Sequence, residues 1–74
     1  MNRERRNRLR TVITRLGSCA DDLSAIKDDE DEARENTPEN LQGGEAYCVS
    51  EEISDKIDNA LSDIQEAVDT LEDI

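Results

Sequence analysis

Apolar residues recur every three or four positions along two long stretches of this chain. In the first stretch they are Leu9, Val12, Leu16, Cys19, Leu23 and Ile26. Alternating steps of three and four place side chains on one side of an α-helix that packs against another helix. Ile13 and Ala20 broaden this stripe, as in the wide apolar face of bundle helices. The pattern predicts a helix from about residue 3 to about residue 33.

The second stretch follows the same rule closer to the end of the sequence. Its stripe consists of Ile53, Ile57, Ala60, Ile64, Ala67, Leu71 and Ile74, and Leu61 and Val68 broaden it. A helix could begin near Glu45, or later with Ser50 as its N-cap. Ala46 and Val49 continue the stripe backwards, which favours the earlier start. We therefore expect the second helix to span about residues 45–73.

Residues 34–44 form the predicted connection between the two helices. Pro38 cannot occupy a helix interior, and a threonine directly before a proline is typical of a helix N-cap. Thr37 and Pro38 therefore predict a short helical turn, which the Gly43-Gly44 pair would end. Two amphipathic helices with a short connection indicate a single all-α domain, an antiparallel helical hairpin.

Charge is segregated along the chain. The net charge is −11, from 20 acidic and nine basic residues without histidine. Six arginines lie within residues 3–15, and most acids follow Ala20. An antiparallel hairpin would bring the arginines beside Asp63, Glu66, Asp69, Glu72 and Asp73. Such surface pairs are weak individually, but their pattern favours antiparallel over parallel packing.

The length of the chain and the width of its stripes suggest self-association. Seventy-four residues are close to the lower limit for a self-sufficient core. Each stripe is wide enough to touch more than one neighbouring helix. We therefore expect a homodimeric four-helix bundle, with a monomeric hairpin as the alternative. The residues predicted to form the core or dimer contact are Leu9, Val12, Leu16, Leu23, Ile26, Ile53, Ile57, Ile64 and Leu71.

The residue types predict no cofactor, no metal site and no enzymatic activity. A histidine base, a phosphate-binding glycine loop and room for a sizeable pocket are all missing. Cys19 and Cys48 would lie roughly 16 Å apart along the hairpin, too far for a disulfide. We expect Cys19 to be a small core residue and Cys48 to be partly exposed. The acidic run 28–32 has a spacing tolerable for calcium, but Ala33 stands where a calcium loop needs glycine, so a solvated helix end is favoured.

The sequence favours a cytoplasmic protein without membrane association. Its apolar runs are far shorter than a bilayer span. Residues 16–19 resemble a lipoprotein cleavage box, but Arg8, Arg10 and Arg15 interrupt the apolar stretch that a signal peptide needs. Gly17 lies within the first predicted helix, where glycine costs about 1 kcal/mol relative to alanine. It would mark either a bend or a close helix contact.

The connection also carries a family resemblance. Its residues 36–42, Asn-Thr-Pro-Glu-Asn-Leu-Gln, are similar to the N-x-P-E-[SN]-L-Q stretch of small acidic helical-hairpin proteins of unknown function from Gram-positive gut bacteria, their phages and mobile elements. The basic residues 1–10 and the helical turns 57–61 and 64–68 resemble other parts of that group. The sequence departs from the group after Gln42, where the group has a more polar helix start. The resemblance implies the hairpin fold and a mobile-element setting, without a mechanism.

Two surfaces suggest functions. Carboxylates on the polar face of the second helix could imitate a phosphate backbone and attract a basic protein; they are Asp55, Asp58, Asp63, Glu66, Asp69 and Glu72. This hypothesis of a non-enzymatic interaction protein is favoured. The arginines within residues 3–15 could instead contact nucleic acid. That alternative is less favoured, because no aromatic residues interleave with the arginines and the whole chain is acidic. A purely structural, self-assembling module is the third possibility.

Overall fold

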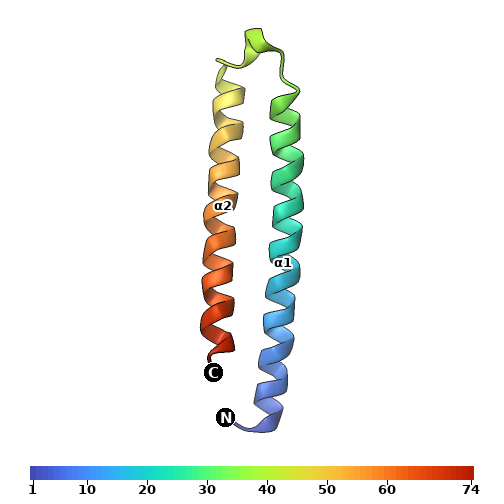
Figure 1. Ribbon diagram of the computed structural model, residues 1–74, viewed down its shortest axis with the longest axis vertical. Helices are drawn as coiled ribbons and strands as arrows, with labels where there is room; N and C mark the ends of the chain where they lie inside the picture. Colours follow the sequence, from blue (N-terminus) through green and yellow to red (C-terminus); the bar gives the residue numbers. More distant parts are fainter.

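The protein is a single helical hairpin. The computed structural model describes all 74 residues and contains helix α1 (Arg3–Glu35), the short 3-10 helix η1 (Glu39–Leu41) and helix α2 (Glu45–Glu72). The two long helices run side by side in opposite directions, and the two termini lie at the same end (Figure 1). The molecule measures 60 × 15 × 12 Å. The prediction of an all-α hairpin is confirmed, and α1 ends two residues later than expected.

The helices begin and end where local hydrogen bonds can be satisfied. At the start of α1, the Asn2 side chain accepts a hydrogen bond from the Arg5 backbone N–H at 2.8 Å, as an N-cap residue does. The connection contains the expected short helical turn. Thr37 does not cap this turn, however: Pro38 occupies the N-cap position, no side chain caps the turn, and the Thr37 hydroxyl donates to the Ala33 carbonyl 3.4 Å away. The predicted N-cap role of Thr37 is therefore wrong.

The line of contact between the helices is rotated relative to the centre of the predicted stripe. The half-buried apolar side chains of α1 are Leu9, Ile13, Leu16, Ala20 and Leu23. Those of α2 are Ile57, Ala60, Leu61, Ile64, Val68 and Leu71. The residues expected only to broaden the stripes therefore lie on the observed contact line; they are Ile13, Ala20, Leu61 and Val68. Val12, Ile26 and Ile53, which the sequence assigned to the core or dimer contact, are exposed in the hairpin.

Two helices alone bury very few residues. No apolar residue is buried, and the one buried residue is Ser54, which is 4% exposed. Cys19 is exposed, so its assignment as a small core residue is wrong for the hairpin, and Cys48 is exposed as well. Hydrophobic burial is the main force that stabilises a fold. This hairpin leaves much of its apolar surface exposed, so it gains little of that stabilisation.

Gly17 allows a direct test of local helix stability. A Cβ atom at this position would have no heavy atom within 4 Å beyond the local helix, so the glycine does not serve a close helix contact. We expect Gly17→Ala to stabilise the protein by about 1 kcal/mol, because alanine loses less backbone entropy in a helix. Urea denaturation followed by circular dichroism measures this. An unchanged or lower midpoint would contradict it.

Candidate functional site

A cluster of polar side chains joins the two helices near the turn. This polar cluster consists of Lys27, Asp31 and Arg34 from α1 with Ser50 and Ser54 from α2. The Ser54 hydroxyl donates to Asp31 Oδ1 at 2.6 Å and accepts from Arg34 Nη1 at 2.8 Å. Arg34 Nη1 also lies 3.1 Å from the Ser50 carbonyl and 3.2 Å from its hydroxyl. Arg34 thus connects one turn of α1 to two turns of α2.

Asp31 is the charged centre of the polar cluster. Lys27 Nζ lies 2.8 Å from its Oδ2, and Arg34 Nη2 lies 2.8 Å from its Oδ1. Hydrogen bonds from Lys27, Ser54 and Arg34 hold the pKa of Asp31 well below its usual range. The same contacts raise the pKa of Lys27 and of Arg34. No buried side-chain polar atom lacks a partner, so the cluster is satisfied and fixes the level at which the helices face each other.

Sequence reasoning missed the polar cluster, although a signal was present. The spacing of three and four that links Leu9 to Leu23 continues through Lys27 and Arg34, and in α2 it extends backwards from Ile57 to Ser54 and Ser50. The contact line therefore changes from apolar to polar at Lys27. The acidic run 28–32 was expected to be a solvated helix end. It does lie within α1, but Asp31 turns towards α2 and is only half exposed.

The depressed pKa of Asp31 predicts a pH-dependent effect of Asp31→Asn. A carboxylate with a folded-state pKa below its unfolded value contributes stability above the unfolded pKa and loses it as pH falls through the folded pKa. We expect Asp31→Asn to destabilise the protein at pH 7, and the difference from wild type to shrink below about pH 4. Urea denaturation at neutral and acidic pH measures both values.

Asp28→Asn is the matched control, because Asp28 is exposed and forms no ion pair or side-chain hydrogen bond. It should have little effect at either pH. An Asp31→Asn penalty that is equally large in acid would contradict the role assigned to the Asp31 charge.

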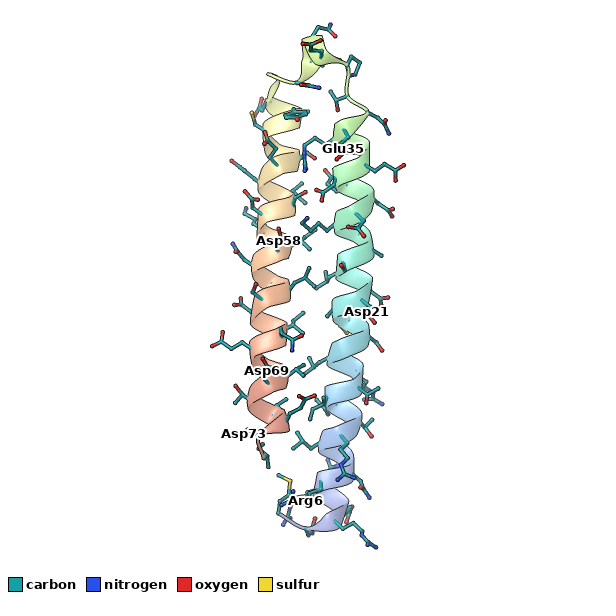
Figure 2. The ribbon with its side chains drawn as sticks, viewed as in Figure 1. Arg6, Asp21, Glu35, Asp58, Asp69 and Asp73 are labelled. Atoms are coloured by element: carbon teal, nitrogen blue, oxygen red, sulfur yellow. The ribbon has the colours of Figure 1, made fainter.

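The six carboxylates of α2 singled out from the sequence are all exposed. Asp58 lies 3.7 Å from Lys27 Nζ, and Asp69 accepts a hydrogen bond from the side chain of its neighbour Gln65 at 2.9 Å. Asp55, Asp63, Glu66 and Glu72 form no ion pair or side-chain hydrogen bond. Charged side chains project outwards along both helices (Figure 2). These carboxylates are therefore available to an external partner.

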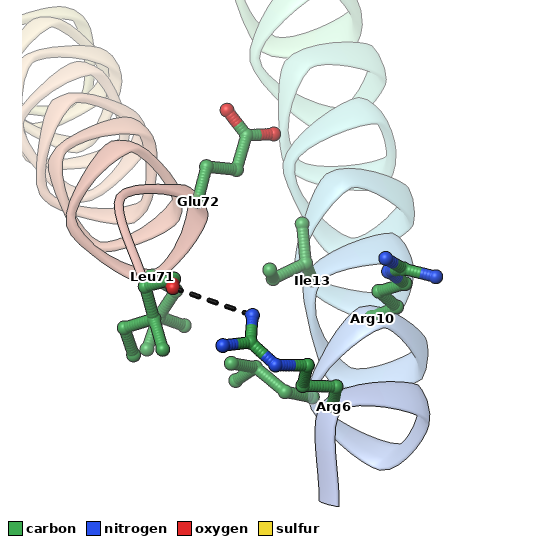
Figure 3. A pocket seen from close by; sticks show the side chains of 7 residues that line it. Arg6, Arg10, Ile13, Leu71 and Glu72 are labelled. Carbon is green, nitrogen blue, oxygen red and sulfur yellow. Dashed lines mark hydrogen bonds between the residues drawn. The ribbon is translucent and has the colours of Figure 1, made fainter. Parts of the chain in front are cut away.

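The arginines near the start of α1 do not pair with α2. The three ion pairs of the protein all involve Lys27 or Arg34. The expected pairing of the arginine-rich start with Asp63, Glu66, Asp69, Glu72 and Asp73 is therefore wrong. Only Arg6 reaches across, where Nη1 lies 3.5 Å from the Ile74 carbonyl oxygen beside a shallow hollow of about 210 Å³ (Figure 3). Leu9, Ile13 and Leu71 line this hollow with Arg6 and Glu72.

The cysteines and the acidic side chains form no disulfide or metal site in the hairpin. Both cysteines are free. No three acidic or thiol side chains come together in a way that could hold a metal ion. Neither long helix contains a stretch apolar enough to cross a membrane. Comparison with known proteins finds no matching family model, no matching curated protein and no matching solved structure.

Proposed function

We propose that this chain is a non-enzymatic interaction protein that presents the carboxylates of α2 to a basic protein partner. The supporting observation is that these carboxylates are exposed on one rigid helix and mostly unpaired. The pairs Asp55–Asp58 and Asp69–Glu72 are fourteen residues apart, so they recur on the same side of α2. A row of negative charge with a net protein charge of −11 attracts and orients a basic surface.

The protein acts in this proposal as a homodimeric four-helix bundle in the cytoplasm. Self-association is supported by the absence of any buried apolar residue in a chain of this size. The cytoplasmic setting is supported by two free cysteines, which reducing compartments preserve. The resemblance to hairpin proteins of phages and mobile elements suggests a bacterial partner, such as a host or defence protein.

The test is a pull-down from nuclease-treated bacterial lysate with three baits. Wild type should retain a basic protein. The variant Asp55→Asn/Glu66→Gln/Asp69→Asn should lose it, because three charges of the α2 surface are removed. The control Asp21→Asn/Asp28→Asn/Glu32→Gln removes the same charge from exposed positions of α1 and should retain it. Recovery of no basic protein, or equal loss with both variants, would sink the proposal.

Nucleic-acid binding is the second candidate, and one observation favours it. None of the arginines between Arg3 and Arg15 forms an ion pair within the hairpin, so they are free to contact phosphates. A gel-shift assay at low salt separates the two functions. A shift that disappears in Arg3→Ala/Arg6→Ala/Arg10→Ala would favour this candidate, and no shift with the wild-type protein would exclude it.

A further inference from the structure

One side of the hairpin is apolar along its length. In α1, every seventh residue from position 12 is apolar: Val12, Cys19, Ile26 and Ala33. In α2 the same spacing gives Ala46, Ile53, Ala60 and Ala67. Nearly all of them directly precede a residue of the contact line, such as Ile13, Lys27 or Ser54. We call these two rows together the apolar side face.

The two rows lie on the same side of the hairpin. In antiparallel helices, residues that precede the contact line on each helix flank the same side of the pair. The structure agrees near the turn, where Ala33 of α1 and Ala46 of α2 line one hollow. Asp31 and Asp58, which directly follow their contact-line residues, meet at Lys27 on the opposite, polar side.

The apolar side face contains several of the exposed large apolar side chains. Val12 is 44% exposed, Ile26 is 55% exposed and Ile53 is 41% exposed. Val49 borders this face four residues before Ile53, and Leu41 lines the hollow at its turn end. An apolar face that runs along a helical hairpin of this size normally packs against another element.

Charges along the border of α1 identify the occupant. Each α1 residue of the apolar side face has a charged residue four positions before it, on the same side of the helix. These charged residues are Arg8, Arg15, Asp22 and Asp29. The order of two positive and two negative charges is self-complementary when two copies of α1 run antiparallel. Arg8 then faces Asp29 and Arg15 faces Asp22, each from the other copy. The centre of this arrangement falls at Cys19.

We propose that a second copy of this chain covers the apolar side face along α1, with α1 packed antiparallel against α1 and Cys19 next to the two-fold axis. The proposal gives Arg8 and Arg15 the partners that they lack in the hairpin. It rests on the dimer that is part of the proposed function. Most carboxylates of the α2 surface stay free in this dimer, because residues such as Asp55, Glu66 and Asp69 do not border the apolar side face.

The other antiparallel arrangement, with α1 against the second copy's α2, is less favourable. Lys27 lies beside Asp58 within the hairpin. Counting five residues along each helix from this pair places Asp22 level with Asp63. A two-fold axis parallel to the helices would therefore bring Asp22 beside Asp63 of the second copy. Both residues border the apolar side face, and like charges repel there.

The two cysteines provide a matched cross-linking test. Cys48 → Ser leaves Cys19 as the only thiol, and Cys19 → Ser leaves Cys48, which faces away from the apolar side face. After treatment with a short bis-maleimide at tens of micromolar protein, the Cys48 → Ser protein should run as a covalent dimer in denaturing gels, and the Cys19 → Ser protein should stay monomeric. The reverse pattern would overturn the proposal.

A charge exchange tests the pairing of α1 with α1. Arg15→Asp should weaken the dimer about tenfold in sedimentation equilibrium, because two ion pairs become repulsive. Arg15→Asp/Asp22→Arg should restore wild-type affinity, because the exchanged charges face each other again. The wild-type protein could be a dimer in which Cys19 does not cross-link, or in which the charge exchange does not restore the dimer affinity. Either result would show that this arrangement is wrong, while self-association stands. A wild-type monomer would refute both.

Discussion

Leu16→Asp is expected to abolish most of the helical structure of the protein at room temperature. Leu16 lies half-buried on the contact line in the apolar half of the hairpin. The substitution removes apolar contact and places a carboxylate between two apolar surfaces; each change costs about 2 kcal/mol, or about 4 kcal/mol together. A small helical domain has only about 3–5 kcal/mol of stability from its core. Since short helices are marginal without tertiary packing, both α1 and α2 should lose structure together.

Far-UV circular dichroism measures this effect, with Ser18→Asp as the control at the same protein concentration. Ser18 is exposed on α1, two residues from Leu16, and forms no side-chain hydrogen bond. The control adds the same charge without touching the contact line, so it should keep the wild-type helix content. A Leu16→Asp protein that melts at the wild-type temperature would show that the helices do not depend on the contact seen here.

Ser54→Ala has the second largest expected effect. Ser54 is 4% exposed, and its hydroxyl both donates to Asp31 and accepts from Arg34. Loss of a buried hydroxyl that forms two hydrogen bonds to charged groups costs about 1–2 kcal/mol. For a domain of this size, the melting temperature should fall by about 5–15 °C.

Ser62→Ala is the matched control for this loss, because Ser62 is exposed on the same helix and forms no side-chain hydrogen bond. Alanine favours helices slightly more than serine does, so the control should melt at or slightly above the wild-type temperature. Equal melting temperatures for the two variants would mean that the polar cluster contributes nothing measurable to the hairpin.

The helices could be predicted from the sequence because their signals are local and repeated. The three-four spacing extends through most of α1 and α2, and Pro38 interrupts it once. The rotation of the contact line could not be predicted in the same way. Val12 and Ile13 are both apolar, so spacing alone does not decide which of them faces α2. That choice depends on the partner helix, and the apolar residues left outside are the ones that form the apolar side face.

The polar cluster and the free arginines show a different limit of sequence reasoning. Charge segregation led to the correct antiparallel direction, yet the expected pairs between the two ends do not form. The direction follows already from the short connection and the two stripes. Conversely, the spacing does place three polar residues on the contact line: Lys27, Arg34 and Ser54. Because polar residues usually face solvent, the sequence did not identify them as contact residues. Polar residues can be assigned to a helix contact only when their hydrogen-bond partners are known.

The division of the contact line into a polar half near the turn and an apolar half near the chain ends also shapes how the hairpin closes. Arg34 and Ser50 are 16 residues apart in the chain, whereas Leu9 and Leu71, which line one hollow, are far more distant. Closing the longer loop costs about 1 kcal/mol more in chain entropy. The contacts with the lowest closure cost are therefore the polar ones, and the apolar contacts near the chain ends form last. A hairpin that is closed only near the turn lacks these apolar contacts, so the two helices should associate in a single cooperative step.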